Sequence, residues 1–500
     1  MTRLNRILCF AAAACLMGAD NPKDADTKSW WRTTEILSAD NMEGRDTGSA
    51  ACQRAADYVA DRFRKAGLQP AGDNHTFFQS VAMSEVAVDT ATFTVERDHG
   101  AALPIEFLQQ ITVTPSTGLP PETEAPLTFR GYCGKEAMKD ITGKIVVCFG
   151  TQRQGLPAGA ERTANARAGN AAGILTVDDP YFTIEPPRWP AAYARTVSLT
   201  APSANPLLTM RLSSKVFPAL IEGAGQDAAA VLMAGGHKEA LKSFDIPARL
   251  RIHTHVTQKA YSSPNVLATL PGGPEYVVIA AHLDGYGYGT PVLGDKLYNG
   301  ALDDAAYVAL IIQFADNLHS QHLTLKRSIL FCAFTGEEKG LLGSNYFVAH
   351  PTVPTAQLAA DINLDQLRPL FPLNILTASA IDDSTLGQTA RQVGSTMGIE
   401  LRPDREPERG LIRRADNFPF LRIGVPAISF VFGYDPGTDA ERRYREWYDV
   451  RYHRPQDDVT QPMNFEAAAK FNQFFYKLTE AVASAPERPA FLPGSPYAKH

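Results

Sequence analysis

The sequence has few cysteines and lacks a cysteine-based metal motif. Six cysteines occur among 500 residues, and Cys52, Cys133, Cys148 and Cys332 are the four that follow the first nineteen positions. Their spacing matches neither a zinc ribbon nor a CxxC redox pair. Cys133 and Cys148 are close enough in sequence to form a disulfide in an oxidising compartment, but the sequence does not show whether the side chains meet.

Basic charge and long apolar runs are also scarce. The formal net charge is -6, which argues against a nucleic-acid partner, because such a partner usually requires a basic face. After position 19 no stretch is long and apolar enough to span a bilayer, so we expect no membrane-spanning segment. No internal repeat is evident. The length favours one large domain plus a second, inserted or appended one.

The first nineteen residues have the pattern of an export signal. Arg3 and Arg6 precede the apolar run Ile7–Ala19, which is too short to cross a membrane. We therefore expect residues 1–19 to be a signal peptide and the mature protein to be periplasmic or secreted. A frayed N-terminal helix is the alternative, and Cys15 leaves open a lipoprotein cleavage site.

The remaining sequence has two kinds of predicted secondary structure, a β-rich middle segment and flanking segments in which helices and strands alternate. Residues 106–255 contain short strand-like segments separated by Pro- and Gly-rich turns, which predicts a mainly β insert. Around this insert, helical periodicity and buried strands alternate, which predicts a largely parallel sheet. The segments are Ser49–Ala66, Tyr276–Ala281, Asp303–Leu318, Arg327–Phe334, Ala359–Leu364, Ala427–Phe432 and Phe465–Ala483.

These patterns predict an α/β fold, a three-layer sandwich with a mostly parallel central sheet. The discontinuous main domain would cover residues 27–105 and 256–485, and residues 486–500 would form a loose, Pro-rich tail.

Acidic residues and histidines follow the predicted strands or begin a predicted helix. The functional crevice of an open α/β sheet lies beyond the carboxyl ends of its strands, so we expect these side chains to converge. The set is His282, Asp284, Asp303, Asp304, Glu337, Glu338, Asp365, Tyr452 and His453.

Convergence of so many carboxylates would be unfavourable without cations. Zinc suits mixed histidine and carboxylate ligands, and one carboxylate must bridge if two metals lie about 3.5–4 Å apart. Taken singly, each residue has an ordinary explanation, such as a helix cap or a solvated turn. Their joint placement favours a metal site.

With these motifs the sequence resembles the co-catalytic dizinc aminopeptidases, a family of zinc exopeptidases that includes secreted bacterial leucyl-type enzymes and glutamate carboxypeptidase. The matching segments are Met42–Ser49, Gly67–Asp73, Asn265–Gly272, Ala281–Gly285, Gly294–Asp304, Phe334–Ser344, Asn363–Asp365 and Tyr452–Pro455. Two positions depart from the family pattern. Asn417 replaces a frequent histidine, and Gln366 replaces a frequent methionine.

The resemblance implies a role for each residue of the set. Two zinc ions would be bound by five ligands: His282 and Asp365 on one ion, Glu338 and His453 on the other, and Asp303 as the bridge. Asp303 and Asp304 would be joined by a cis peptide bond. The remaining roles are general base for Glu337, oxyanion stabilisation for Tyr452 and orientation of His282 for Asp284.

The implied function is that of an exported aminopeptidase that hydrolyses the N-terminal peptide bond of peptides with a water activated by two metals. The insert resembles a protease-associated domain through Ile141–Val147 and Ala164–Leu175, and such domains lie at the substrate entrance in this family. The segment Gly433–Val450 is expected to form a specificity loop.

Two other readings remain open. One is another dizinc hydrolase of the same fold, either a carboxypeptidase or an N-acyl amidohydrolase. The other is an inactive binding protein on a peptidase scaffold, which the complete ligand set disfavours. A glutaminyl cyclase fits poorly, since that relative uses one zinc. The sequence does not indicate an oligomeric state.

Overall fold

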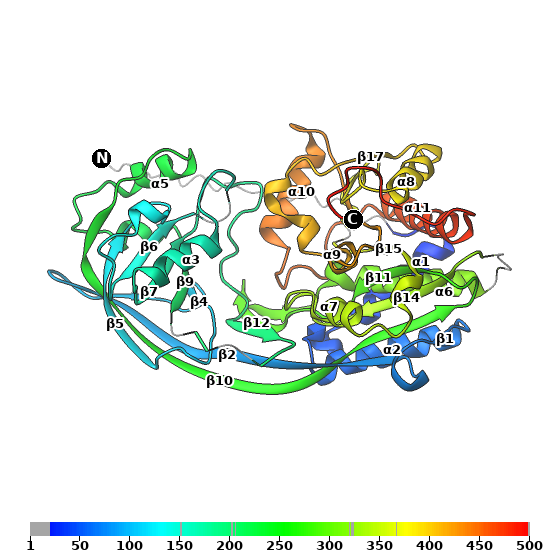
Figure 1. Cartoon of the computed structure of the whole chain (residues 1–500), viewed down its shortest axis with the longest axis horizontal. Helices are drawn as coiled ribbons and strands as arrows, with labels where there is room; N and C mark the ends of the chain where they lie inside the picture. Colours follow the sequence, from blue (N-terminus) through cyan, green and yellow to red (C-terminus); the bar gives the residue numbers. More distant parts are fainter. Residues whose placement is uncertain are drawn as a thin grey trace, which may run out of the picture.

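Two long curved strands, β2 (Phe78–Arg97) and β10 (Phe244–Leu270), pair with each other and join two lobes of the protein (Figure 1). The computed structural model describes residues 21–150, 153–201, 204–205, 207–319, 321, 325–366 and 368–498. The predicted signal peptide and Cys15 lie outside these residues. Within them, no helix combines the length and hydropathy that crossing a membrane requires.

The first lobe is built on a mostly parallel sheet, as the sequence predicts. Its four central strands lie parallel in the order β18, β15, β11, β14. They are β11 (Tyr276–His282), β14 (Ser328–Phe334), β15 (Leu358–Asn363) and β18 (Ala427–Phe432). Antiparallel strands flank this core, with β10 on one side and β16 (Ile375–Ala378) on the other. The central strands are largely buried and mainly apolar because helices cover both faces, although β15 also carries Asp361 and Asn363.

Alternate residues of each strand enter opposite apolar cores, which gives three layers. Ile279 and Phe331 lie in the larger core with helices α1 (Ala25–Leu37), α2 (Ala50–Lys65), α6 (Ala306–His319) and α11 (Phe465–Ser484). Val278 and Leu330 lie in the smaller core with α7 (Leu342–Ala349) and α9 (Asn417–Arg422).

The second lobe has its own apolar core and consists mainly of strands. Strands β5 (Glu122–Phe129), β6 (Ile145–Phe149), β7 (Gly173–Val177) and β9 (Leu208–Leu212) run parallel, and β4 (Ile111–Val113) closes the edge antiparallel to β9. Strand β10 continues without a break through position 255. The domain boundaries given above therefore stay a prediction, since the chain passes between lobes inside long strands.

Three local features add to the sequence reading or differ from it. Cys133 and Cys148, whose pairing the sequence left open, form a disulfide in the second lobe, and Cys52 and Cys332 are buried free thiols. The expected specificity loop is instead largely a helix, α10 (Asp439–Val450). Its buried aromatic residues recur at helical spacing, which explains the difference.

The C-terminal segment is not loose in its described part. The backbone N–H of Thr385 donates to the carbonyl of Ala490, and that of Leu492 donates to the carbonyl of Asp383. Phe491 packs against the smaller core. Prolines exclude regular structure here without preventing the chain from docking on the lobe.

Candidate active site

The carboxyl ends of the parallel strands bring the first predicted ligand group together. His282 is the last residue of β11, and Asp365 lies two residues beyond β15. The Nε2 atom of His282 lies 3.2 Å from Oδ1 of Asp303 and 4.0 Å from Oδ1 of Asp365. Since these three ligand atoms come from separate elements, the fold itself creates the cluster.

A second group forms around the other oxygen of Asp303. The Nε2 atom of His453 lies 3.3 Å from Oδ2 of Asp303 and 3.2 Å from Oε2 of Glu338. Each carboxylate oxygen of Asp303 thus faces a different histidine. Both triplets, His282 with Asp303 and Asp365, and Asp303 with Glu338 and His453, bring their ligand atoms within 4.8 Å of one another.

The polar atoms of this cluster have unmet bonding capacity. Oδ2 of Asp303, Oε1 of Glu338 and Oδ1 of Asp365 are buried and have no hydrogen-bond partner among the described residues. Buried charges without partners are strongly unfavourable unless they coordinate a metal. The donor set of imidazole and carboxylate suits zinc, so these residues fit the metal that the sequence predicts.

Burial and mutual repulsion make the ionised form of the carboxylates in this cluster unfavourable. Burial and the neighbouring Asp303 raise the pKa of Asp365 to about 7. Burial also raises the pKa of Glu337 and of Glu338 well above the usual range. By contrast, burial, aided by Arg188, lowers the pKa of His453 to about 3 and keeps this imidazole neutral. Divalent cations would offset the repulsion among the acids, and a neutral histidine can serve as a ligand.

Asp284 fixes the backbone of the predicted general base. Its Oδ1 accepts a 3.0 Å hydrogen bond from the N–H of Glu337, and its Oδ2 accepts one of 2.7 Å from the hydroxyl of Thr47. Nδ1 of His282 lies 3.1 Å from the backbone carbonyl of Asp284 but 3.9 Å from its carboxylate. The carbonyl therefore holds the imidazole more closely than the predicted carboxylate does.

The turn that carries Asp303 is held by an acid that the sequence reasoning missed. The peptide bond between Asp303 and Asp304 is cis, as the resemblance implies. The carboxylate of Asp457 accepts hydrogen bonds of 3.0 Å from the backbone N–H groups of both Leu302 and Asp303. Only its position four residues after His453 could have drawn attention to it.

Tyr452 lies beside the cluster with its hydroxyl oxygen held by two donors. Nε2 of Gln366 donates to it at 2.9 Å, and Nη2 of Arg414 donates at 3.1 Å. With both lone pairs engaged, the hydroxyl hydrogen of Tyr452 is free to point at another acceptor. Gln366 thus helps to position the hydroxyl of Tyr452, which a methionine could not do because it cannot donate this hydrogen bond.

Tyr286 was also missed by the sequence reasoning. Its hydroxyl lies 2.7 Å from Nδ1 of His453, on the far side of the imidazole from the carboxylates. With Asp303, Glu338 and His453 it lines a small cavity of about 10 Å³. No pattern in the sequence distinguishes this tyrosine from its neighbour Tyr288.

A loop of the second lobe reaches the same region. Arg454, directly after His453, donates hydrogen bonds to the backbone carbonyls of Pro190 (2.6 Å) and Trp189 (3.1 Å). Glu185 and Arg188 from this loop, together with Arg409 and Arg414 of the first lobe, line a cavity of about 350 Å³. The insert therefore contributes side chains next to the candidate site.

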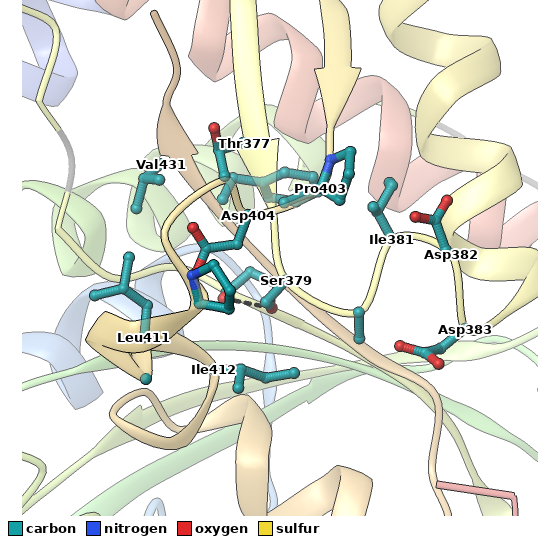
Figure 2. Close-up of a pocket in the computed structure, with 16 residues that line it drawn as sticks. Thr377, Ser379, Ile381, Asp382, Asp383, Pro403, Asp404, Leu411, Ile412 and Val431 are labelled. Atoms are coloured by element: carbon teal, nitrogen blue, oxygen red, sulfur yellow. Dashed lines mark hydrogen bonds between the residues drawn. The ribbon is translucent and has the colours of Figure 1, made fainter. Parts of the chain in front are cut away.

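A separate cavity of about 230 Å³ is lined by residues that are not part of the candidate active site. Figure 2 shows the residues that line it, among them Thr377, Asp404, Leu411 and Ile412, and the hydrogen bond between the hydroxyl groups of Ser379 and Ser429. None of the predicted metal-binding or catalytic residues lines it. We therefore do not associate it with the reaction.

Comparison with known proteins gives a consistent family. Residues 265–479 match the sequence profile of peptidase family M28. A probable zinc metalloprotease of Pyrenophora tritici-repentis is 28% identical over 262 residues, which cover 45% of this chain and 58% of that protein. A glutaminyl-peptide cyclotransferase of Bos taurus is 28% identical over 222 residues, which cover 36% of this chain and 60% of that protein. The matches span somewhat more than half the length of these relatives.

A solved structure extends the comparison to nearly the whole chain. The aminopeptidase from Aneurinibacillus sp. strain AM-1 superposes with a TM-score of 0.63 at 18% identity, covering 92% of this chain and 95% of that chain. At this identity the likeness establishes a shared fold, with both lobes included in the match.

Proposed function

We propose that this chain, whose residues 265–479 match the profile of peptidase family M28, is an exported aminopeptidase that uses two zinc ions. The observation that carries the proposal is the placement of Asp303, whose two oxygens face His282 and His453 respectively. A carboxylate between two such groups suits a bridging ligand. The name of the Aneurinibacillus structure supports the aminopeptidase assignment.

Zinc bound by His282, Asp303, Glu338, Asp365 and His453 would polarise the substrate carbonyl and lower the pKa of a water molecule. Glu337 lies next to these ligands, with its Oε2 4.0 Å from Nε2 of His282. Its backbone N–H is anchored by the carboxylate of Asp284. In the proposal Glu337 accepts a proton from the attacking water and delivers it to the departing amine.

Tyr452 would stabilise the negative charge that develops on the carbonyl oxygen. Its hydroxyl oxygen already accepts hydrogen bonds from Gln366 and Arg414, which leaves its hydrogen available for an oxyanion. A fixed donor of this kind needs no reorganisation during the reaction.

We also propose that the protein is exported and that its insert acts as a protease-associated domain. The N-terminal charge and apolar pattern and the Cys133–Cys148 disulfide support export, since structural disulfides persist in oxidising compartments. The contacts of Arg454 with the insert loop support a place for the insert at the substrate entrance.

Another reaction on the same scaffold is the second candidate. The bovine relative is a cyclotransferase, and carboxypeptidases or N-acyl amidohydrolases are further candidates. Five well-placed ligands favour a two-metal hydrolase over a one-metal cyclase.

The experiment compares amino-acid anilides with their N-acetylated counterparts, using zinc-loaded protein. The proposal expects rapid cleavage of the free-amine substrates and at least a hundredfold slower cleavage of the acetylated ones. Equal cleavage of both would refute the aminopeptidase assignment. Cyclisation of an N-terminal glutamine without anilide hydrolysis would identify a cyclotransferase instead.

A further inference from the structure

Arginine side chains gather on the Tyr452 side of the metal-binding cluster. Nη2 of Arg414 donates to the hydroxyl of Tyr452, and Cζ of Arg188 lies 4.6 Å from the centroid of its ring. Cζ of Arg368 lies 5.4 Å from the same centroid, and Arg409 lies nearby along the lobe interface. Arg188 and Arg414 therefore contact Tyr452 directly and line the cavity beside it, Arg409 lines the same cavity, and Arg368 is fully buried near the ring.

Few carboxylates balance this charge. Glu185 pairs with Nη1 of Arg414 at 2.6 Å and lies 3.8 Å from both Arg188 and Arg409. Arg368 has no ion pair among the described residues, and its guanidinium bonds to Tyr444 and Gln366 instead. Glu185 is thus shared by three arginines, and among the described residues only Arg409 has a second ion pair, with Glu406 at 3.5 Å. The cluster accommodates a carboxylate, and Arg188 and Arg414 have capacity for another.

Arg188 has a hydrogen-bond donor that no described residue accepts from. Its Nη1 atom is buried and has no hydrogen-bond partner in the described part of the chain, although Arg188 borders the 350 Å³ cavity between the lobes. An unpaired buried donor is costly, and a guanidinium binds a carboxylate with two parallel hydrogen bonds. The loop that carries Arg188 belongs to the insert and is held by Arg454, next to His453.

We propose that Arg188, with Arg414, binds a carboxylate of the peptide substrate, so that the enzyme prefers peptides with a carboxylate next to the bond it cleaves. This inference rests on the proposed peptidase function. The carboxylate has two sources: the side chain of an acidic first residue, or the C-terminus of a dipeptide. Both place a carboxylate within one residue of the scissile bond.

Two matched substrate pairs separate these sources. The first pair is the glutamyl and glutaminyl anilides, and the second is leucyl-glycine and leucyl-glycinamide. We expect kcat/KM to favour the carboxylate member at least about tenfold in one pair, as charge-assisted hydrogen bonds allow. The pair that shows the preference identifies the source.

Variants assign the preference to the cluster. Arg188→Gln should bring the kcat/KM ratio of the responding pair close to one. Arg251→Gln is the matched control, because Arg251 lies in the insert, pairs with Glu96 and Glu124 and does not line the cavity. It should keep the ratio of the unmodified protein. If Arg188→Gln does not fold, Arg188→Lys, which keeps the charge but loses the two-pronged geometry, should lower the ratio at least threefold.

Failure of the inference is distinguishable from failure of the proposed function. Ratios near one in both pairs, with all four compounds cleaved, would overturn the inference and leave the aminopeptidase intact. An unchanged preference in Arg188→Gln would also overturn it. If none of the four is cleaved, the proposed function fails. In that case, calorimetric titration with the same four compounds tests carboxylate binding directly. The inference requires the carboxylate member of one pair to bind at least tenfold more tightly than its amide partner. Equal affinities within both pairs would contradict it.

Discussion

The hydroxyl of Tyr286 lies 2.7 Å from Nδ1 of His453, and the two ring centroids are 4.5 Å apart. A neutral imidazole that presents the lone pair of Nε2 to a metal carries its proton on Nδ1, which then donates to the tyrosine oxygen. Partners of this kind fix the ring orientation and raise the basicity of a metal-binding histidine.

Replacing Tyr286 by phenylalanine should therefore weaken zinc binding about 10- to 100-fold while the fold is retained. Competition with a chromogenic chelator measures the affinity. Tyr288→Phe is the control, since Tyr288 is about half exposed and lies two residues away. Unchanged zinc affinity in Tyr286→Phe would show that this hydrogen bond does not support the ligand.

Glu337→Gln should retain both zinc ions and lose turnover by about 10²- to 10⁴-fold, because the amide cannot carry the proton between water and the leaving amine. Metal analysis and kcat are measured on the same sample. Glu338→Gln, one residue later, should instead lose metal, since Glu338 is a proposed ligand. Near-normal turnover in Glu337→Gln would exclude Glu337 as the general base.

The sequence predicted the clustering of side chains best where strands carry the candidate ligands. His282 and Asp365 follow buried apolar runs, so the geometry of a parallel sheet alone brings their carboxyl-end positions together. Tyr286 and Asp457 act through contacts with His453 and with the Asp303 turn, and such contacts between distant loops leave no local pattern in the sequence.

In the fold, too, local sequence patterns predicted some features, whereas contacts between distant segments were not predictable. Parallel strands were predictable from continuous apolar runs, and so was the β-rich insert. The approach of Arg188 to Tyr452 was not, because it depends on how two lobes meet across β2 and β10. Helix α10 was misjudged as a loop because its many charged residues masked the helical spacing of Tyr444, Trp447 and Tyr448.

Labelling of the cysteine thiols tests both the Cys133–Cys148 disulfide and the burial of Cys52 and Cys332. Burial raises the pKa of Cys52 to about 11, so at pH 8 only about one molecule in a thousand carries the reactive thiolate. Burial also raises the pKa of Cys332. For a chain that lacks residues 1–19, we expect a thiol reagent at pH 8 to label no cysteine in the folded state.

The same chain, unfolded in denaturant without reductant, should expose two thiols, because Cys133 and Cys148 remain joined. After reduction the count should rise to four. Four reactive thiols before reduction would contradict the disulfide, and rapid labelling of the folded protein would contradict the burial of Cys52 and Cys332.

The most direct test is the zinc content of the purified protein, measured by elemental analysis alongside Asp303→Asn and the control Asp361→Asn. Asp303 faces both histidines of the cluster, whereas Asp361 is a buried acid of β15 outside the ligand groups. We predict two zinc ions per chain in the unmodified protein and in Asp361→Asn, and fewer than one in Asp303→Asn. A content of one zinc or none in the zinc-loaded, unmodified protein, or two in Asp303→Asn, would contradict a metal pair bridged by Asp303.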